Sequence, residues 1–571
     1  MNRKVILSAA AAVLVQLLSS SRTQAVDYYF SPSGSDGNSG TSAGSAFASL
    51  SKISTLNLQP GDNIKLLAGA QFTGNVTLPS GTGIDAATGN AAGAPIKITT
   101  YGGSSLAVIN AGIGTGISAP NSGNIEISNL RLVGAGAHFD QGAQKYIYDN
   151  TGNGIEFINH NGKKNDHVVI KNVVAEKFGQ NGVWLGASGQ GGFKNISISN
   201  VIASENQLAG IATMGDPNNG NRDNFNNLTI SQSAAFKNYG RDKEPNKQNS
   251  GSGIVIGQVK GGTIERSVAY GNGVRCDSIQ GGPVGIWAWD SDTITIQHNE
   301  SYNNGTAGQL DGGGFDLDGG VVNSVIQYNY SHGNDGAGYL LAQYPGAKPM
   351  GNNTIRYNIS QNDGRKNDFG AIHIWADVDN TNIYNNTIFV GPSDSGTPSA
   401  VRFHQFSGEN VRLLNNLLMV DKAGPGDDPK MISLTQGPGG LFDGNAYWND
   451  GESGIFNPAD LRALYLDLAR QHKLHGPAGQ GPTLKDAQLL DTLVEYTLND
   501  DSPLIDRGIN LLAQYGIDPG GYDFYGLNLR GDAWDIGASE NQSGAVPTPE
   551  PVALGFLSLG ATSLLRRRRP L

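Results

Sequence analysis

The sequence predicts an all-β parallel solenoid, in which short strands wind into stacked coils. Two observations predict it. Short runs of aliphatic and β-branched residues recur around a turn-forming Asn, and no helical spacing interrupts them. The recurring Asn residues are spaced by 30, 29, 28 and 30 residues, at Asn299, Asn329, Asn358, Asn386 and Asn416. Earlier copies of the same turn are assigned to Asn129, Asn172 and Asn200.

The recurring Asn also predicts what joins the coils. Asn favours turns because its side chain bonds to nearby backbone groups. When the same turn stacks coil upon coil, each side-chain amide can bond to the backbone of the next coil, as in other Asn ladders. We therefore expect an Asn ladder along the solenoid.

Composition excludes several classes of protein. The chain carries 39 Lys and Arg against 50 Asp and Glu, a net charge of −11, which argues against a nucleic-acid partner. Its single cysteine, Cys276, excludes a disulfide scaffold, a zinc ribbon and a CxxC redox site. An apolar fraction of 38%, before glycine is counted, is enough to build a core.

The amino-terminal residues 1–25 are interpreted as a secretory signal peptide. Arg3 and Lys4 precede an apolar run over residues 5–18, and Thr23-Gln24-Ala25 has the small-x-small pattern of a cleavage site. The alternative is a short membrane anchor, although the apolar run is shorter than a membrane span. The signal predicts a secreted protein.

The carboxyl-terminal residues 541–571 have three parts. Pro549-Glu550-Pro551 precedes an apolar stretch over residues 552–565, and four arginines follow at 566–569. Such a segment would sit in a membrane with its arginines at the cytoplasmic face. This ending resembles the PEP-CTERM sorting signal of Gram-negative bacteria that make extracellular polysaccharide. The resemblance implies transient membrane association, cleavage by an exosortase-type partner, and sorting to the cell surface or extracellular matrix. A plain short anchor is the alternative.

The repeats resemble the right-handed parallel β-helix (pectin-lyase-like) superfamily over roughly residues 27–540. An opening such as Tyr28–Asp36 and an ending such as Ser502–Gly508 with Asp535–Glu540 fit the same superfamily. We expect a repeat domain over residues 26–455. A C-terminal helix and closing segment should follow over residues 456–540, because residues 458–472 place apolar side chains on one helical face. The protein is expected to be a monomer.

Alternation along the strands predicts which side chains face outward. Strands such as Ile286-Trp287-Ala288-Trp289 and Phe315-Asp316-Leu317-Asp318 are apolar at the first and third positions, so the second and fourth should face out. One outward column is Trp184, Ala212, Val255, Trp287, Asp316, Leu340, His373 and Arg402. The other is Met214, Gly257, Trp289, Asp318, Ala342, Trp375 and His404.

The outward columns have the composition of a carbohydrate site. We predict Asp316 and Asp318 as a catalytic acid/base or nucleophile pair, with Asp290 assisting, because neighbouring carboxylates raise one pKa and suit a general acid. Trp287, Trp289 and Trp375 would stack on sugar rings. The alternatives are packing of these aromatic residues under a loop, Asp-Gly turn chemistry at Asp318, and a Ca²⁺ site at Asp311, Asp316 and Asp318.

A second chemistry is open on the same face. His373 or Lys348 could abstract a sugar C5 proton while Arg402, with His404 beside it, neutralises a uronate carboxylate. The motifs typical of polygalacturonases and alginate epimerases are absent from the sequence.

The leading prediction is a glycoside hydrolase that degrades polysaccharide and requires no cofactor. A Ca²⁺-dependent polysaccharide lyase or epimerase acting on uronic-acid polymers is the second prediction. A non-catalytic glycan-binding protein of the exopolysaccharide matrix is the third.

Overall fold

The computed structural model describes residues 24–393, 395–421, 426, 429–437, 439–449, 496–498, 500, 502, 504–530 and 534–542. The predicted helix over residues 458–472 lies outside these residues. So do nearly all of the predicted signal peptide and the sorting segment after residue 542. None of the described helices is long and apolar enough to cross a membrane.

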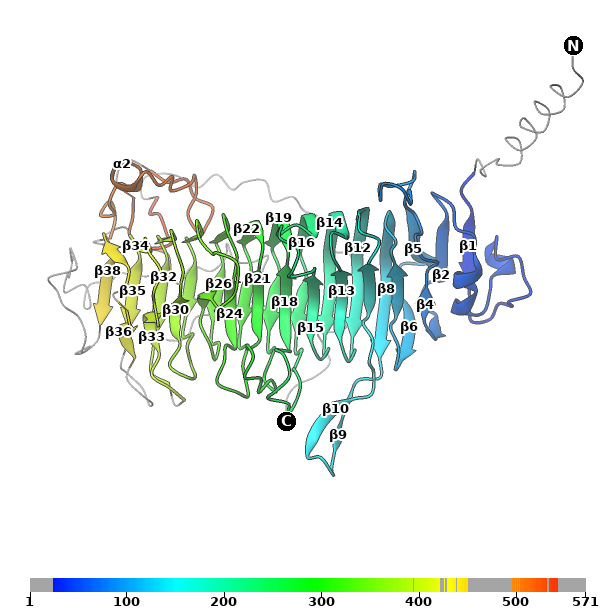
Figure 1. Ribbon diagram of the computed structural model, residues 1–571, viewed down its shortest axis with the longest axis horizontal. Coiled ribbons are helices and arrows are strands. Elements are labelled where there is room, and N and C mark those ends of the chain that lie inside the picture. The colour runs from blue at the N-terminus through cyan, green and yellow to red at the C-terminus, as the bar shows by residue number, and fades with distance from the viewer. Residues whose placement is uncertain are drawn as a thin grey trace, which may run out of the picture.

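The described chain winds into a parallel β-helix, which confirms the predicted all-β solenoid. Its strands stack along the long axis from the N-terminal coils to β38 (Figure 1). One 12-stranded sheet carries the candidate site on its outward side, here called the outer face. Its strands are β4 (Val76–Thr77), β7 (Ile117–Pro120), β11 (Ile155–Asn159), β13 (Asn181–Ala187), β15 (Ala209–Met214), β18 (Ser252–Gly257), β21 (Val284–Trp289), β24 (Gly313–Asp318), β27 (Tyr339–Gln343), β30 (Gly370–Ala376), β33 (Ser399–His404) and β36 (Lys430–Thr435).

A 24-stranded sheet forms the rest of the coil wall as two parallel stacks. The first stack contains β1 (Asp27–Phe30), β2 (Asn63–Leu67), β5 (Ile96–Tyr101), β16 (Phe225–Ser231), β19 (Val259–Glu265), β22 (Asp292–Gln297), β25 (Val325–Gln327), β28 (Thr354–Arg356), β31 (Asn382–Tyr384), β34 (Arg412–Leu414) and β37 (Leu441–Asp443). The second contains β3 (Gln71–Thr73), β6 (Ala107–Gly112), β17 (Ala234–Phe236), β20 (Val268–Tyr270), β23 (Glu300–Tyr302), β26 (Tyr330–His332), β29 (Ile359–Gln361), β32 (Thr387–Val390), β35 (Leu417–Val420) and β38 (Ala446–Asn449). Three long strands run through both stacks: β8 (Ile125–Gly134), β12 (Lys164–Glu176) and β14 (Gly192–Ser204).

The remaining elements decorate the solenoid. An antiparallel hairpin of β9 (Ala137–Asp140) and β10 (Lys145–Tyr148) projects from one edge (Figure 1). Short 3-10 turns η1 (Ala43–Ser45) and η2 (Leu50–Thr55) follow β1. The short helix α2 (Leu511–Tyr515) is capped by Asn510, whose side chain accepts a hydrogen bond from the Ala513 N–H.

The core lies inside the coils, where the alternation predicted it. Inward residues such as Ile286, Phe315, Leu317 and Ile372 are fully buried. Burial of each such side chain stabilises the fold by about 1.5–3 kcal/mol. Tyr339 is also fully buried, and its hydroxyl lies 2.7 Å from the Asn329 carbonyl and 2.9 Å from the Ile359 carbonyl. A buried tyrosine therefore fits this core because both neighbouring coils offer a hydrogen-bond acceptor.

Asn ladders join successive coils, as the repeat predicted. The Asn299 N–H donates to the Asn329 side-chain oxygen at 2.9 Å, and the Asn299 side-chain amide donates to the same oxygen at 3.0 Å. The pattern continues through Asn358, Asn386, Asn416 and Asn445. A second ladder runs from Asn206 through Asn238, Asn272, Asn304 and Asn334 and ends at Asp363.

The assignment of the earlier Asn copies was wrong by one position. Strand pairing aligns Ser199 with Ser231, Glu265 and Gln297, so Asn200 matches His298 rather than Asn299. Asn129, Asn172 and Asn200 occupy the turn residue itself, at φ of 61°, 53° and 51°. Asn tolerates this left-handed conformation better than most residues, so the same residue type recurs there for a different reason.

Candidate active site

The outer face has the two columns that the alternation predicted. Strand pairing places Trp287 beside Asp316 and Trp289 beside Asp318. The columns continue from Asp316 through Leu340 to His373 and Arg402, and from Ala342 through Trp375 to His404.

Asp316 and Asp318, here called the acid pair, form the centre of this face on β24. Asp316 is 3% exposed, and its Oδ1 has no hydrogen-bond partner among the described residues. Burial, followed by the charges of Asp318 and Asp311, raises the pKa of Asp316 well above its usual range. Burial raises the pKa of Asp318 to about 7, although its Oδ1 accepts a hydrogen bond from the Gly319 N–H at 2.7 Å. The pair can therefore hold one proton near neutral pH.

Two half-buried tryptophans flank the acid pair along the coil axis. Trp289 lies over Gly257 of the preceding coil, so closely that a Cβ added at Gly257 would lie 2.3 Å from the indole nitrogen. Trp375 packs against the apolar cluster that contains Leu340, Ala342 and Phe369. The small residues Gly257 and Ala342 thus leave room for indole rings on either side of the carboxyl groups.

Trp287 lies differently from the other two predicted tryptophans. It is 8% exposed, and its indole N–H donates to the Ser252 hydroxyl at 3.1 Å. Trp287 therefore forms part of the floor beneath the site and offers little ring surface to a sugar.

Asp290, Lys348 and Arg222, here called the wall cluster, join two loops at the edge of the face. Lys348 Nζ lies 2.6 Å from Asp290 Oδ2 and 3.0 Å from the Asn219 carbonyl. Arg222 Nε lies 3.4 Å from Asp290 Oδ1 and 2.6 Å from the Gly320 carbonyl. The Lys348 side chain is thus engaged by Asp290 and by the Asn219 carbonyl. Asp290 likewise acts here as an anchor between loops.

His373, His404 and Arg402, here called the histidine cluster, lie farther along the axis. His373 is 2% exposed, and burial lowers its pKa well below the usual range, so the ring is neutral. Its ring centroid lies 4.9 Å from that of Phe369 and 5.6 Å from that of His404. Arg402 donates to the Asp368 carbonyl. Leu340 separates His373 from Asp316, a distance of two coils or about 10 Å.

The Ca²⁺ alternative names Asp311, Asp316 and Asp318, and the charge of Asp311 acts on both other carboxyl groups. Among the described residues, no group of three His, Cys, Asp or Glu side chains could hold a metal ion. Asp311 instead accepts a hydrogen bond from the Gly282 N–H at 2.7 Å.

Three further residues shape the site and could not be predicted from the sequence. Tyr344 lies over Gly319, where an added Cβ would be 2.2 Å from its ring, and burial with the charges of Asp318 and Asp290 raises its pKa. Arg222 belongs to the wall cluster, and Phe369 contacts His373. All three lie in loops or at a strand edge, where alternation gives no signal.

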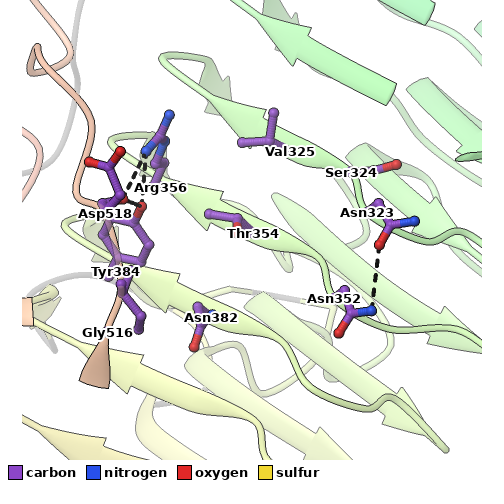
Figure 2. A pocket seen from close by; sticks show the side chains of 11 residues that line it. Asn323, Ser324, Val325, Asn352, Thr354, Arg356, Asn382, Tyr384, Gly516 and Asp518 are labelled. Atoms are coloured by element: carbon purple, nitrogen blue, oxygen red, sulfur yellow. Dashed lines mark hydrogen bonds between the residues drawn. The ribbon is translucent and has the colours of Figure 1, made fainter. Parts of the chain in front are cut away.

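A separate groove of about 470 Å³ lies on the 24-stranded sheet beneath residues 516–518 (Figure 2). Its polar groups bond to one another: Arg356 Nη1 lies 3.0 Å from the Tyr384 hydroxyl and 3.4 Å from the Asp518 carbonyl. The groove contains none of the predicted site residues. It marks where the C-terminal segment docks on the coils.

One comparison with known protein families supports the fold. A family model described as a right handed beta helix region matches residues 219–388. The chain is 39% identical over 108 residues to a lacto-N-biosidase of Bifidobacterium longum subsp. longum. That match covers 19% of this chain, and the chain spans about 6% of the length of the curated relative.

Solved structures are more distant. A GH136 lacto-N-biosidase from Eubacterium ramulus is similar at a TM-score of 0.38 and 15% identity, over 72% of this chain and 68% of that one. The A-module of the Azotobacter vinelandii mannuronan C-5 epimerase AlgE6 is similar at a TM-score of 0.45 and 15% identity, over 70% of this chain and 94% of that one.

Proposed function

We propose that this protein is a glycoside hydrolase acting on polysaccharide, with Asp316 as the general acid and Asp318 as the base or nucleophile. The observation that carries the proposal is the state of Asp316. Its carboxyl group is buried beside a second carboxyl, and Oδ1 lacks a hydrogen-bond partner within the described structure. Such a group keeps its proton at neutral pH, and no other group of the described protein engages its Oδ1.

The proposed chemistry uses both carboxyl groups. Asp316 donates its proton to the glycosidic oxygen as the bond to the anomeric carbon breaks and positive charge develops on the sugar. Asp318, ionised, either attacks the anomeric carbon or takes a proton from an attacking water. Their backbones are about 6.6 Å apart on one strand face, and side-chain rotation allows the carboxyl separations of both retaining and inverting enzymes.

The tryptophans support a sugar substrate. Trp289 and Trp375 lie on opposite sides of the acid pair along the axis, and each rests on a small residue. The apolar face of a sugar ring can stack on an indole, so one sugar on each side of the scissile bond would be held. The local similarity to a lacto-N-biosidase also favours a glycoside-cleaving enzyme.

Two other functions remain candidates. A Ca²⁺-dependent lyase or epimerase on uronic-acid polymers would use the histidine cluster and Lys348, but Lys348 is paired with Asp290 and His373 is nearly fully buried. A matrix protein that binds glycan without turnover would need only the tryptophans. Secretion, exosortase-type sorting and a monomeric state complete the proposal and rest on the sequence.

One assay distinguishes the three functions. The purified protein is incubated with neutral and uronic polysaccharides, with and without EDTA, while reducing ends and ultraviolet absorbance of unsaturated products are followed together. Hydrolysis predicts new reducing ends without absorbance, and their loss in Asp316→Asn but not in the exposed control Asp149→Asn. A rise in both signals would indicate a lyase, and bound polymer with neither signal would indicate a matrix protein.

A further inference from the structure

The outer face carries a third half-buried tryptophan, Trp184 on β13, which the proposed reaction does not use. Strand order on this sheet is β13, β15, β18, β21, β24, β27 and β30. Trp184 is therefore three coils from Trp289 on β21, and Trp289 is three coils from Trp375 on β30. Adjacent coils are about 4.8 Å apart, so neighbouring tryptophans of this row are about 14 Å apart along the axis. The row from Trp184 to Trp375 is about 29 Å long.

Trp184 and Trp289 are seated in a similar way. The Trp184 indole lies over Gly186, where an added Cβ would be 2.7 Å from its ring nitrogen, and Trp289 lies over Gly257. A glycine under each ring lets the indole approach the backbone. Both rings therefore have one side on the sheet and remain partly exposed on the other.

The surface between these two rings is low and uncharged. The outward residues of the four coils from β13 to β21 are Trp184, Gly186, Ala212, Met214, Val255, Gly257, Trp287 and Trp289. Met214 is 42% exposed, Val255 is half-buried, and Ala212 and Gly257 are buried. These residues can contact the apolar faces of sugars in an extended glycan, but none of them can pair with a charged group on it.

Cations at the margins of the face are already engaged. Lys348 and Arg222 bind Asp290, and the Arg275 guanidinium lies 3.6 Å and 4.3 Å from the ring centroids of Tyr146 and Tyr239. A polyanion would also meet the acid pair. Arg402 and His404 lie one coil beyond β30, so the charges along the coils from β13 to β30 favour an uncharged glycan.

We propose that the outer face binds an uncharged glycan chain lengthwise across the coils from β13 to β30, with Trp184 as a distal residue that selects for length. This inference rests on the proposed function, because it gives the substrate class of the same site. A disaccharide cannot contact Trp184 and Trp375 together, since about 29 Å separates their strands. The cut is placed within the chain because the row extends to both sides of the acid pair, about 19 Å toward Trp184 and about 10 Å toward Trp375.

The binding test uses Asp316→Asn, so that polymer is not consumed, in native gels cast with neutral β-1,4-glucan, xylan, mannan or galactan, or with polygalacturonate or alginate. We expect retardation by at least one neutral polymer and by neither uronic polymer. Adding Trp184→Ala should weaken that binding about tenfold, and Trp184→Phe should restore part of it. Tyr522→Ala, which removes an exposed aromatic ring on the C-terminal segment, should change nothing.

Turnover by the unmodified chain is measured separately on the same neutral polymer. Early products of intermediate length, with a Trp184→Ala defect on polymer but not on short oligosaccharides, are expected. Terminal disaccharide as the first product, retardation by uronic polymers alone, or unchanged binding in Trp184→Ala would each overturn the inference while leaving hydrolysis intact. Absence of turnover with Trp184-dependent binding would instead overturn the proposed reaction and leave the lengthwise binding in place.

Discussion

The floor and the wall of the site treat buried aspartates in opposite ways. Asp316 in the floor is 3% exposed and forms no ion pair among the described groups, whereas Asp290 in the wall is 5% exposed and forms ion pairs with Lys348 at 2.6 Å and Arg222 at 3.4 Å. Both carboxyl groups cost free energy to bury. In the wall cluster, Lys348 and Arg222 offset the cost of burying Asp290, and their ion pairs fix the loops in place. At Asp316 no cation offsets the cost of burial, and the carboxyl group therefore keeps its proton.

The largest expected effect is the loss of activity when Asp316 is replaced. Asp316→Asn should lower kcat about 10²–10⁴-fold, because a general acid contributes that much to catalysis. The free energy of unfolding at pH 7 should be unchanged or higher, since the substitution removes a buried acid without compensation. Steady-state kinetics and urea unfolding measure both quantities. A large loss of stability would mean that Asp316 serves the fold.

Replacing Asp290 in the wall cluster should mainly lower stability, in contrast to the replacement of Asp316. Asp290→Asn leaves two cations unpaired and should lower the free energy of unfolding by about 2–4 kcal/mol, somewhat less than for a fully buried pair because Lys348 keeps 24% of its side chain exposed. Urea unfolding measures this loss. Asp292→Asn is the matched control, because Asp292 pairs at 3.8 Å with Lys260, whose side chain is 58% exposed, and its loss should cost at most about 1 kcal/mol. Equal losses in the two variants would contradict the role of the wall cluster.

A smaller effect is expected from the glycine beneath Trp289. Gly257→Ala places a methyl group 2.3 Å from the indole, so the ring must move from its seat. We expect KM to rise several-fold with kcat nearly unchanged, because Trp289 binds sugar without taking part in proton transfer. Gly44→Ala, where an added Cβ meets nothing within 4 Å, is the control. A fall in kcat with KM unchanged would place Trp289 in the chemical step.

A further effect is expected on the pH dependence of stability. Because the pKa of Asp318 is raised to about 7, the folded state keeps a proton that the unfolded state loses near pH 4. The unfolded state then binds fewer protons, so the free energy of unfolding falls as pH rises between about 4 and 7. Asp318→Asn should make that decline shallower in urea unfolding across this range. An identical slope in the variant would mean that Asp318 titrates normally.

The fold and the columns could be predicted because both follow from periodicity. Alternation along each strand decides which side chains face out, and the repeat decides which residues are neighbours on adjacent coils. Asn200 shows the limit, since Asn suits both the left-handed turn and the buried ladder, and the sequence does not distinguish them. The partners of Asp290 could not be predicted, because Arg222 and Lys348 lie 68 and 58 residues away in separate loops. For the same reason Tyr344, placed by its loop, escaped notice.

The Asn ladders have a consequence for how such a protein can evolve. Each rung bonds one coil to the next, so a whole coil can be gained or lost without disturbing the pairing on either side, whereas a one-residue slip would turn every inward side chain outward. The distance from Trp184 to the acid pair can therefore change only in increments of one coil, about 4.8 Å. Related chains should therefore differ in the length of glycan they accept by multiples of one coil.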